Sequence, residues 1–124
     1  MTKKNAINWF EIPVSDYERA VTFYENILQC DLKREVMDGF DMAVFPADDV
    51  GVAGSLIKAD FLQPGGQGCV IYLNVEGMMD GVLQRAQARQ ANVLFPKTHI
   101  GEPGYIAHIE DSEGNRIGLH SMAS

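Results

Sequence analysis

Two ionisable residues of the sequence, Glu11 and His120, combine suitable chemistry with a suggestive setting. Glu11 follows Trp9 in an apolar, strand-like segment, where a carboxylate would serve as a general base or accept hydrogen bonds from a ligand. His120 lies near the end of the sequence and would act as an acid, as a base or as a donor that orients a ligand. Two structural alternatives remain open: an ion pair between Glu11 and Arg116, and a surface histidine near a chain end.

A second set of residues would furnish a binding site for a small organic molecule. Aromatic rings with a few polar groups suit an aromatic or small carbonyl ligand. His99 lies in the segment Pro96–Gly104, which its glycines and prolines predict to be a loop, and such a loop could close over a site. For the aromatic and polar residues, the alternative is packing between modules or subunits. For the loop with His99, the alternative is an exposed connection. The predicted ligand-binding residues are Trp9, Tyr72, Asn74, Arg116 and His99.

The spacing of the remaining candidate residues does not indicate a metal or phosphate site. A metal site could in principle be built from Glu11, His108 and His120. The spacing of these three residues in the sequence, however, is not one that is typical of metal sites. Gly65-Gly66 and Gly101–Gly104 are followed neither by Lys-Ser/Thr nor by a helix start, so they are not predicted to bind phosphate. We therefore expect neither a metal nor another cofactor.

The composition is that of an ordinary globular protein, and the 124 residues suit a single domain spanning 1–124. A net charge of −7 without a basic cluster argues against nucleic acids and anionic membrane surfaces as partners. No apolar run approaches the ~20 residues of a membrane span, and the N-terminus lacks a signal-peptide pattern. Cys30 and Cys69 lie far apart, which is typical of reduced thiols and indicates a cytoplasmic location.

The elements that would position these residues occur twice, at an offset of 61 residues. Phe10–Val14 and the helix-like Ser15–Leu28 correspond to Ile71–Val75 and the helix-like Gly77–Gln90. Three short strand-like segments follow each helix: Leu32–Met37, Met42–Phe45 and Val50–Ile57 in the first copy, and Asn92–Phe95, Tyr105–Ile109 and Arg116–Ser121 in the second. The sequence thus predicts an α+β fold of two βαβββ modules, at about residues 5–60 and 68–122, joined by a glycine-rich connector.

Two local signals refine this prediction. Ser15, followed three residues later by Glu18, forms a capping box and is predicted to be the N-cap of the first helix. The dipeptide Asp38-Gly39 between two strand-like segments favours a tight hairpin turn.

Three of the predicted strands have one apolar face and one mixed face. The apolar sets suit packing beneath a helix, and they are Phe10/Ile12/Val14, Ile71/Leu73/Val75 and Ile117/Leu119. Because side chains alternate along a strand, the mixed sets would line the other face of the sheet: Trp9/Glu11, Val70/Tyr72/Asn74 and Arg116/Gly118/His120. If this face curves into a cup, it would hold a small molecule; if it is flat, it is a solvated surface.

In their order along the chain, three segments resemble the vicinal oxygen chelate superfamily of glyoxalase I, bleomycin-resistance proteins and extradiol dioxygenases. These segments are Trp9–Asp16 leading to Ala20–Tyr24, then Tyr72–Val75, and the closing Asp111–Leu119. More narrowly, the chain resembles the small bacterial glyoxalase-like proteins. The resemblance implies paired βαβββ modules, a single glyoxalase-like domain with a concave cleft, and a homodimer.

The same resemblance implies where a family metal would be bound, on the first and last strands of each module. Trp9, Val70 and Gly118 occupy three of these positions, and Ser55-Leu56-Ile57 occupies the fourth, so none offers a carboxylate or imidazole. The expected function is metal-independent binding of a small organic ligand, as in bleomycin-resistance proteins. Two alternatives remain: a lyase or isomerase acting next to a carbonyl, with Glu11 as base and His120 as acid, and a protein–protein interaction module.

Overall fold

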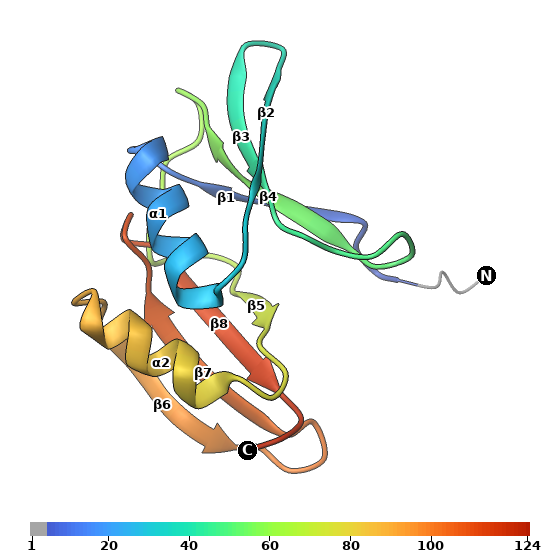
Figure 1. Ribbon diagram of the computed structural model, residues 1–124, viewed down its shortest axis with the longest axis vertical. Helices are drawn as coiled ribbons and strands as arrows, with labels where there is room; N and C mark the ends of the chain where they lie inside the picture. The colour runs from blue at the N-terminus through green and yellow to red at the C-terminus, as the bar shows by residue number, and fades with distance from the viewer. Residues whose placement is uncertain (1–4) are drawn as a thin grey trace.

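The computed structural model describes residues 5–124 and contains two modules of similar design (Figure 1). The first module comprises β1 (Trp9–Pro13), α1 (Tyr17–Leu28), β2 (Lys33–Met37), β3 (Phe40–Val44) and β4 (Ala53–Lys58). The second comprises β5 (Ile71–Asn74), α2 (Met79–Ala88), β6 (Val93–His99), β7 (Tyr105–Glu110) and β8 (Arg116–Ser121). The predicted α+β fold with a duplicated βαβββ unit is confirmed.

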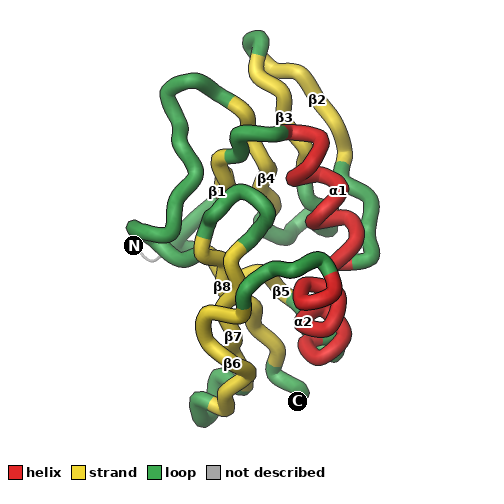
Figure 2. The backbone as a smooth tube through the Cα atoms, turned by 90° about the vertical axis from the view of Figure 1, so that its left-hand side faces the viewer, coloured by secondary structure: helices red, strands yellow, loops and turns green. Residues whose placement is uncertain are grey.

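Each module builds its own four-stranded sheet with the same topology. The strand orders are β1-β4-β3-β2 and β5-β8-β7-β6, and in both sheets the first strand of the module pairs in parallel with the last. A parallel pair needs a long crossover, which the helix and the two intervening strands supply. Figures 1 and 2 show α1 and α2 side by side, each covering the sheet of its own module, so the opposite face of each sheet has no helix over it.

Burial follows the predicted alternation of the strands. Ile12, Leu73 and Leu119 on the helix-covered faces are at most 7% exposed and belong to one core. Trp9 and Tyr72 on the opposite faces remain 44% and 45% exposed. The mixed sets therefore lie on the helix-free faces, as the sequence predicts.

The hairpin between β2 and β3 also forms as predicted. Met37 pairs with Phe40, and the two residues between them, Asp38 and Gly39, have φ values of 51° and 82°. Two successive left-handed residues are the backbone of the tight turn that Asp-Gly favours.

The predicted N-cap of α1 is wrong by one residue. Asp16 is the N-cap, because its side chain accepts a hydrogen bond from the backbone N–H of Arg19, and the helix begins at Tyr17. Ser15 instead donates through its backbone N–H and its hydroxyl group to Glu113 of the second module. Glu18 pairs with Arg34 on β2 and is thereby turned away from the capping position.

The predicted loop Pro96–Gly104 is also wrong in its first half, because β6 continues through Pro96 to His99. β6 is an edge strand, and its pairing with β7 shifts register between Val93 and Phe95 and again between Phe95 and Thr98. An edge strand with bulges tolerates proline, whose missing N–H removes no hydrogen bond that the sheet needs.

A buried carboxylate joins the two modules where α1 begins. The side chain of Glu113, in the turn between β7 and β8, is fully buried and accepts hydrogen bonds from the backbone N–H groups of Ser15 and Asp16 at 2.9 and 2.7 Å. The Arg19 guanidinium donates to it at 2.7 Å. Burial alone would raise the pKa of Glu113, but the hydrogen bonds from Arg19, Asp16 and neighbouring serines outweigh burial and lower this pKa from 4.5 to about 2.

The same turn carries a second buried carboxylate, Asp111. It accepts a hydrogen bond of 2.6 Å from the hydroxyl group of Tyr24 on α1 and two more from the backbone N–H groups of Glu113 and Asn115. Asn115 in turn donates to the carbonyl oxygen of Pro13 at 2.8 Å. We call the turn 111–115 with these bonds the clasp, because it holds the second module to both α1 and β1 of the first.

Candidate functional site

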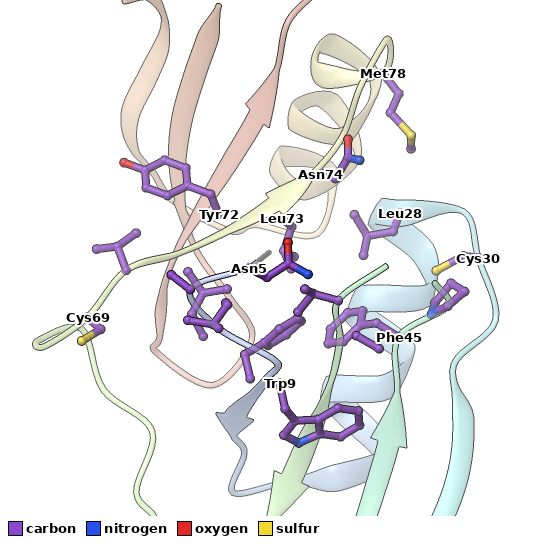
Figure 3. Close-up of a pocket in the computed structure, with 18 residues that line it drawn as sticks. Asn5, Trp9, Leu28, Cys30, Phe45, Cys69, Tyr72, Leu73, Asn74 and Met78 are labelled. Carbon is purple, nitrogen blue, oxygen red and sulfur yellow. The ribbon is translucent and has the colours of Figure 1, made fainter. Parts of the chain in front are cut away.

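A cavity of about 870 Å³ lies between the two modules. Its walls come from the edge strands β1 and β5, the end of α1, the segment that leads into β1 and the connections that follow β3 and precede β5 (Figure 3). Most of the lining is apolar, with polar groups at a few points. The residues that line it include Asn5, Trp9, Phe10, Leu28, Cys30, Phe45, Ala53, Cys69, Tyr72, Leu73, Asn74 and Met78.

Three of the predicted ligand-binding residues border this cavity. Trp9 comes from β1, and Tyr72 and Asn74 come from β5, so both modules contribute (Figure 3). The indole Nε1–H of Trp9 donates to a carboxylate oxygen of Glu11 at 3.4 Å. The side-chain oxygen of Asn74 accepts a hydrogen bond from the backbone N–H of Glu76 at 2.9 Å, which leaves its NH₂ group available to a ligand.

Glu11 and Arg116 line a smaller cavity of about 310 Å³ next to the first. Cys69 and Ile71 line both cavities, so the two adjoin at the start of β5. Within the described residues, neither Glu11 nor Arg116 has an oppositely charged partner within 4 Å, so the suggested ion pair between them is not formed.

The structure does not bring Glu11 and His120 together. His120 lies on β8, and its Nε2 is hydrogen-bonded to the carbonyl oxygen of Pro103. A carbonyl only accepts, so this ring nitrogen carries the proton. His120 is not among the residues that line either cavity, whereas Glu11 lines the smaller one. A shared acid–base site of these two residues therefore remains a sequence-based prediction.

His99 also lies apart from the other candidates. It pairs with Tyr105 across β6 and β7, and the two rings are 4.9 Å apart between centroids. Lys97 lies over the same tyrosine ring and bonds to Asp80 on α2, so this stack belongs to the helix-covered side of the second sheet. The predicted role of His99 in ligand binding stays a prediction.

Sequence reasoning missed the role of His108, which connects two of the candidates. Its Nε2 lies 2.7 Å from the hydroxyl oxygen of Tyr72, and its Nδ1 lies 2.8 Å from the guanidinium of Arg116. Burial and then the charge of Arg116 lower the pKa of His108. Alternation along β7 places His108 on the mixed face, but only the pairing of β5, β8 and β7 shows that the three side chains meet.

Comparison with known proteins identifies the family. The sequence pattern of the Glyoxalase/Bleomycin resistance protein/Dioxygenase superfamily matches residues 6–119. The chain belongs to this superfamily. It matches no curated protein.

Solved structures of this superfamily share the fold over nearly the whole chain. An antibiotic-binding protein from Streptomyces sp. CB03234 is 26% identical with a TM-score of 0.63, and the match covers 98% of each chain. A glyoxalase/bleomycin resistance protein from the same organism is 29% identical with a TM-score of 0.66, covering 90% of this chain and 96% of that one. A glyoxylase/bleomycin resistance protein/dioxygenase domain from Frankia sp. EAN1pec reaches a TM-score of 0.68 at 19% identity, covering 97% and 93%.

The residues at the superfamily's expected metal positions do not fit a divalent cation. Within residues 5–124, no three or more His, Cys, Asp or Glu side chains are grouped so as to hold a metal ion. Ser55 on β4 offers a buried hydroxyl oxygen without a hydrogen-bond partner, which is a weak metal ligand. At Gly118 the ring of Tyr72 fills the space, because a Cβ atom there would overlap the ring.

Within the same described range, none of the helices is both long and apolar enough to cross a membrane.

Proposed function

We propose that this superfamily member binds a small, largely apolar organic molecule in the cavity between its modules, without using a metal. The observation that carries the proposal is the cavity itself, about 870 Å³ in volume and lined by aromatic and aliphatic side chains from both modules. Concave, mostly apolar cavities with a few polar groups are the usual form of small-molecule sites.

Two further observations support a binding protein. Trp9 and Tyr72 are large, half-exposed rings at the rim of the cavity, and such rings supply apolar contact area to a ligand. A structure that shares the fold over 98% of both chains is an antibiotic-binding protein. We extend that kind of function to this chain as a proposal, with an aromatic or small carbonyl compound as ligand.

We also propose that the protein is a homodimer. β1 and β5 are edge strands, and both border the cavity with half-exposed aromatic side chains, Trp9 and Tyr72. Unpaired strand edges flanked by apolar side chains are typical surfaces for association. Light scattering coupled to size exclusion tests this proposal: a mass of about two chains supports it, and a single chain at micromolar concentration contradicts it.

A neutral aromatic probe, N-phenylnaphthylamine, tests the binding function. Its fluorescence rises in an apolar site, and the wild-type protein is expected to give a saturable curve. Ala53→Phe adds a ring within the cavity, beside Trp9, and is expected to weaken probe binding about tenfold or more. Val50→Phe is the matched control, because Val50 is 74% exposed and is not among the lining residues. Unsaturable binding, or equal binding by both variants, would overturn the proposal.

A further inference from the structure

The protonation of the Tyr72–His108–Arg116 chain follows from its geometry. A guanidinium has only donors, so Nδ1 of His108 must accept the hydrogen bond from Arg116. The ring is then neutral and carries its proton on Nε2, which donates to the hydroxyl oxygen of Tyr72. Because this oxygen already accepts from His108, the phenolic proton of Tyr72 must point elsewhere.

The hydroxyl group of Tyr72 and the guanidinium of Arg116, on either side of His108, have O–H or N–H donors without an acceptor in the described part of the protein. Among the described residues, the hydroxyl group of Tyr72 has no hydrogen bond other than the one to His108. Arg116 likewise has only its bond to His108, and no carboxylate lies within 4 Å of it. Arg19, Arg34 and Lys97 have acidic partners, whereas Arg116 has none within residues 5–124 and is held instead by a histidine ring.

The hydrogen-bonded side chains are held in place by packing as well as by hydrogen bonds. The Tyr72 ring lies over Gly118, and only a glycine there leaves room for it. The rings of Tyr72 and His108 meet edge to face at 5.4 Å, and Phe95 contacts His108 from the other side at 5.7 Å. The donors are therefore positioned before any ligand arrives, which lowers the entropic penalty of binding.

We infer that the ligand is an acid whose carboxylate is bound by the hydroxyl group of Tyr72 and the guanidinium of Arg116. This inference rests on the proposed small-molecule binding function and names the chemical class of the ligand. A carboxylate has acceptors only, and a guanidinium with free N–H groups binds it through charge-assisted hydrogen bonds. Tyr72 borders the large cavity and Arg116 borders the small cavity that adjoins it, so we assign the apolar part of the acid to the large cavity and its carboxylate to the helix-free face beside these two side chains.

Two acidic side chains in the neighbourhood bear on this inference. Glu110 lies on the same strand as His108, but its carboxylate accepts a hydrogen bond from the side-chain amide of Asn92 at 3.1 Å. Glu11 lines the small cavity that Arg116 also lines, and repels an anion bound there. The donors of Tyr72 and Arg116 therefore favour an acid locally, although the net negative charge of the protein opposes its binding.

The test compares naphthoate with naphthamide, which has nearly the same shape but no charge. Each compound displaces N-phenylnaphthylamine from the wild-type protein at neutral pH, and naphthoate is expected to bind about tenfold more tightly than the amide. Tyr72→Phe and Arg116→Gln are each expected to weaken naphthoate binding several-fold and naphthamide binding less, so that the ratio of the two affinities falls, because the amide carries no charge. Arg89→Gln removes one positive charge at the end of α2 and serves as the control for net charge.

The outcomes separate this inference from the proposed function. If neither the probe nor the two naphthyl compounds bind, the proposed function fails. If both naphthyl compounds bind equally to the wild-type protein, or if Arg89→Gln has the same effect as Arg116→Gln, the acid-binding inference is overturned while the binding function stands.

A ligand-free measurement tests the geometry independently. Nitrogen-15 NMR of the histidine rings is expected to show His108 neutral at neutral pH, with its proton on Nε2. Arg116→Gln is expected to change the Nδ1 signal of His108, since the donor is altered. A proton on Nδ1 in the wild-type protein would contradict the assigned chain of donors.

Discussion

The two modules are alike on their helix-covered faces and different on their helix-free faces. Beneath the helices, Ile12 of β1 and Leu73 of β5 occupy equivalent buried positions. On the other side, Glu11 pairs with Ser55, whereas the equivalent Tyr72 pairs with Gly118. The first module thus exposes an acid beside a buried hydroxyl group, and the second exposes a phenol whose ring fills the space over a glycine.

This difference shows which constraints act on each face. The helix-covered face must be apolar in both copies, because the core depends on it. The helix-free face has no such requirement, so equivalent positions of the two modules can hold different residues, including residues suited to ligand binding. The asymmetry extends to the helix N-termini, since α1 is capped by Asp16 and receives Glu113 from the other module, whereas α2 has no side-chain cap.

The largest effect is expected from breaking the clasp. Glu113→Gln replaces a buried acceptor-only carboxylate by an uncharged amide; if its oxygen still accepts from the backbone N–H groups of Ser15 and Asp16, its NH₂ group opposes the Nε–H donor of Arg19. We expect the free energy of unfolding to fall by about 3 kcal/mol. Urea unfolding measures it, with Asp80→Asn in the first turn of α2 as control, for which the expected change is under about 1 kcal/mol. If both variants lose the same free energy of unfolding, the clasp stabilises the protein no more than an exposed ion pair does.

The same carboxylate predicts an acid-dependent loss of stability. The pKa of Glu113 is about 2 in the folded protein against 4.5 for the free side chain, so the unfolded state binds a proton first as the pH falls. Its contribution of about 3 kcal/mol is complete above pH 4.5 and disappears as the pH approaches 2. Unfolding free energies measured across this interval should fall more steeply for the wild-type protein than for Glu113→Gln. Parallel curves would contradict the lowered pKa.

Two glycine substitutions compare the faces directly. An added Cβ at Gly54 overlaps the Phe10 ring, and one at Gly118 overlaps the Tyr72 ring. Phe10 packs against the core, with Phe45 at 5.6 Å, so we expect Gly54→Ala to destabilise the protein by about 2–3 kcal/mol.

Gly118→Ala is expected to destabilise the protein by only about 1 kcal/mol, because the Tyr72 ring is half-exposed and can move outward. That movement breaks the bond to His108 and removes the selectivity for naphthoate. In a Tyr72→Ala background, Gly118→Ala should cost almost nothing, which a double-mutant cycle measures. A loss at Gly118 as large as that at Gly54 would mean that the helix-free face is packed as tightly as the core.

The smallest effect is expected at Glu11. Glu11→Gln removes the negative charge that lines the small cavity together with Arg116, so naphthoate should bind about two- to threefold more tightly. The affinity for naphthamide should not change. Displacement titrations at low and high salt measure the effect, and weaker naphthoate binding in this variant would place Glu11 among the groups that hold the ligand.

The sequence was sufficient to predict the fold because its signals are local and repeated. Alternation in Phe10–Val14 and Ile71–Val75, the helix periodicity and the Asp-Gly turn each correspond to one physical cause, and the duplication supports them all. The two errors arise from contacts that are distant in sequence or depend on position in the sheet. Ser15 is bonded to a carboxylate 98 residues away, and Pro96 is accepted in β6 because that strand lies at an edge.

The candidate site was predictable only in part for the same reason. Strand alternation placed Trp9, Tyr72 and Asn74 on the helix-free faces, and all three border the cavity. Nothing local indicates that His108 on β7 reaches Tyr72 across β8, because this contact needs the strand order and a glycine at the crossing.

Energy transfer from Trp9 tests the central claim, a ligand site between the modules, most directly. Trp9 is the only tryptophan of the chain and borders the cavity, so its emission reports on that place alone. Excitation of Trp9 in the presence of increasing N-phenylnaphthylamine should give transfer that saturates at one probe per chain and is lost in Ala53→Phe. Transfer that never saturates, or that persists unchanged in Ala53→Phe, would contradict a ligand site between the two modules.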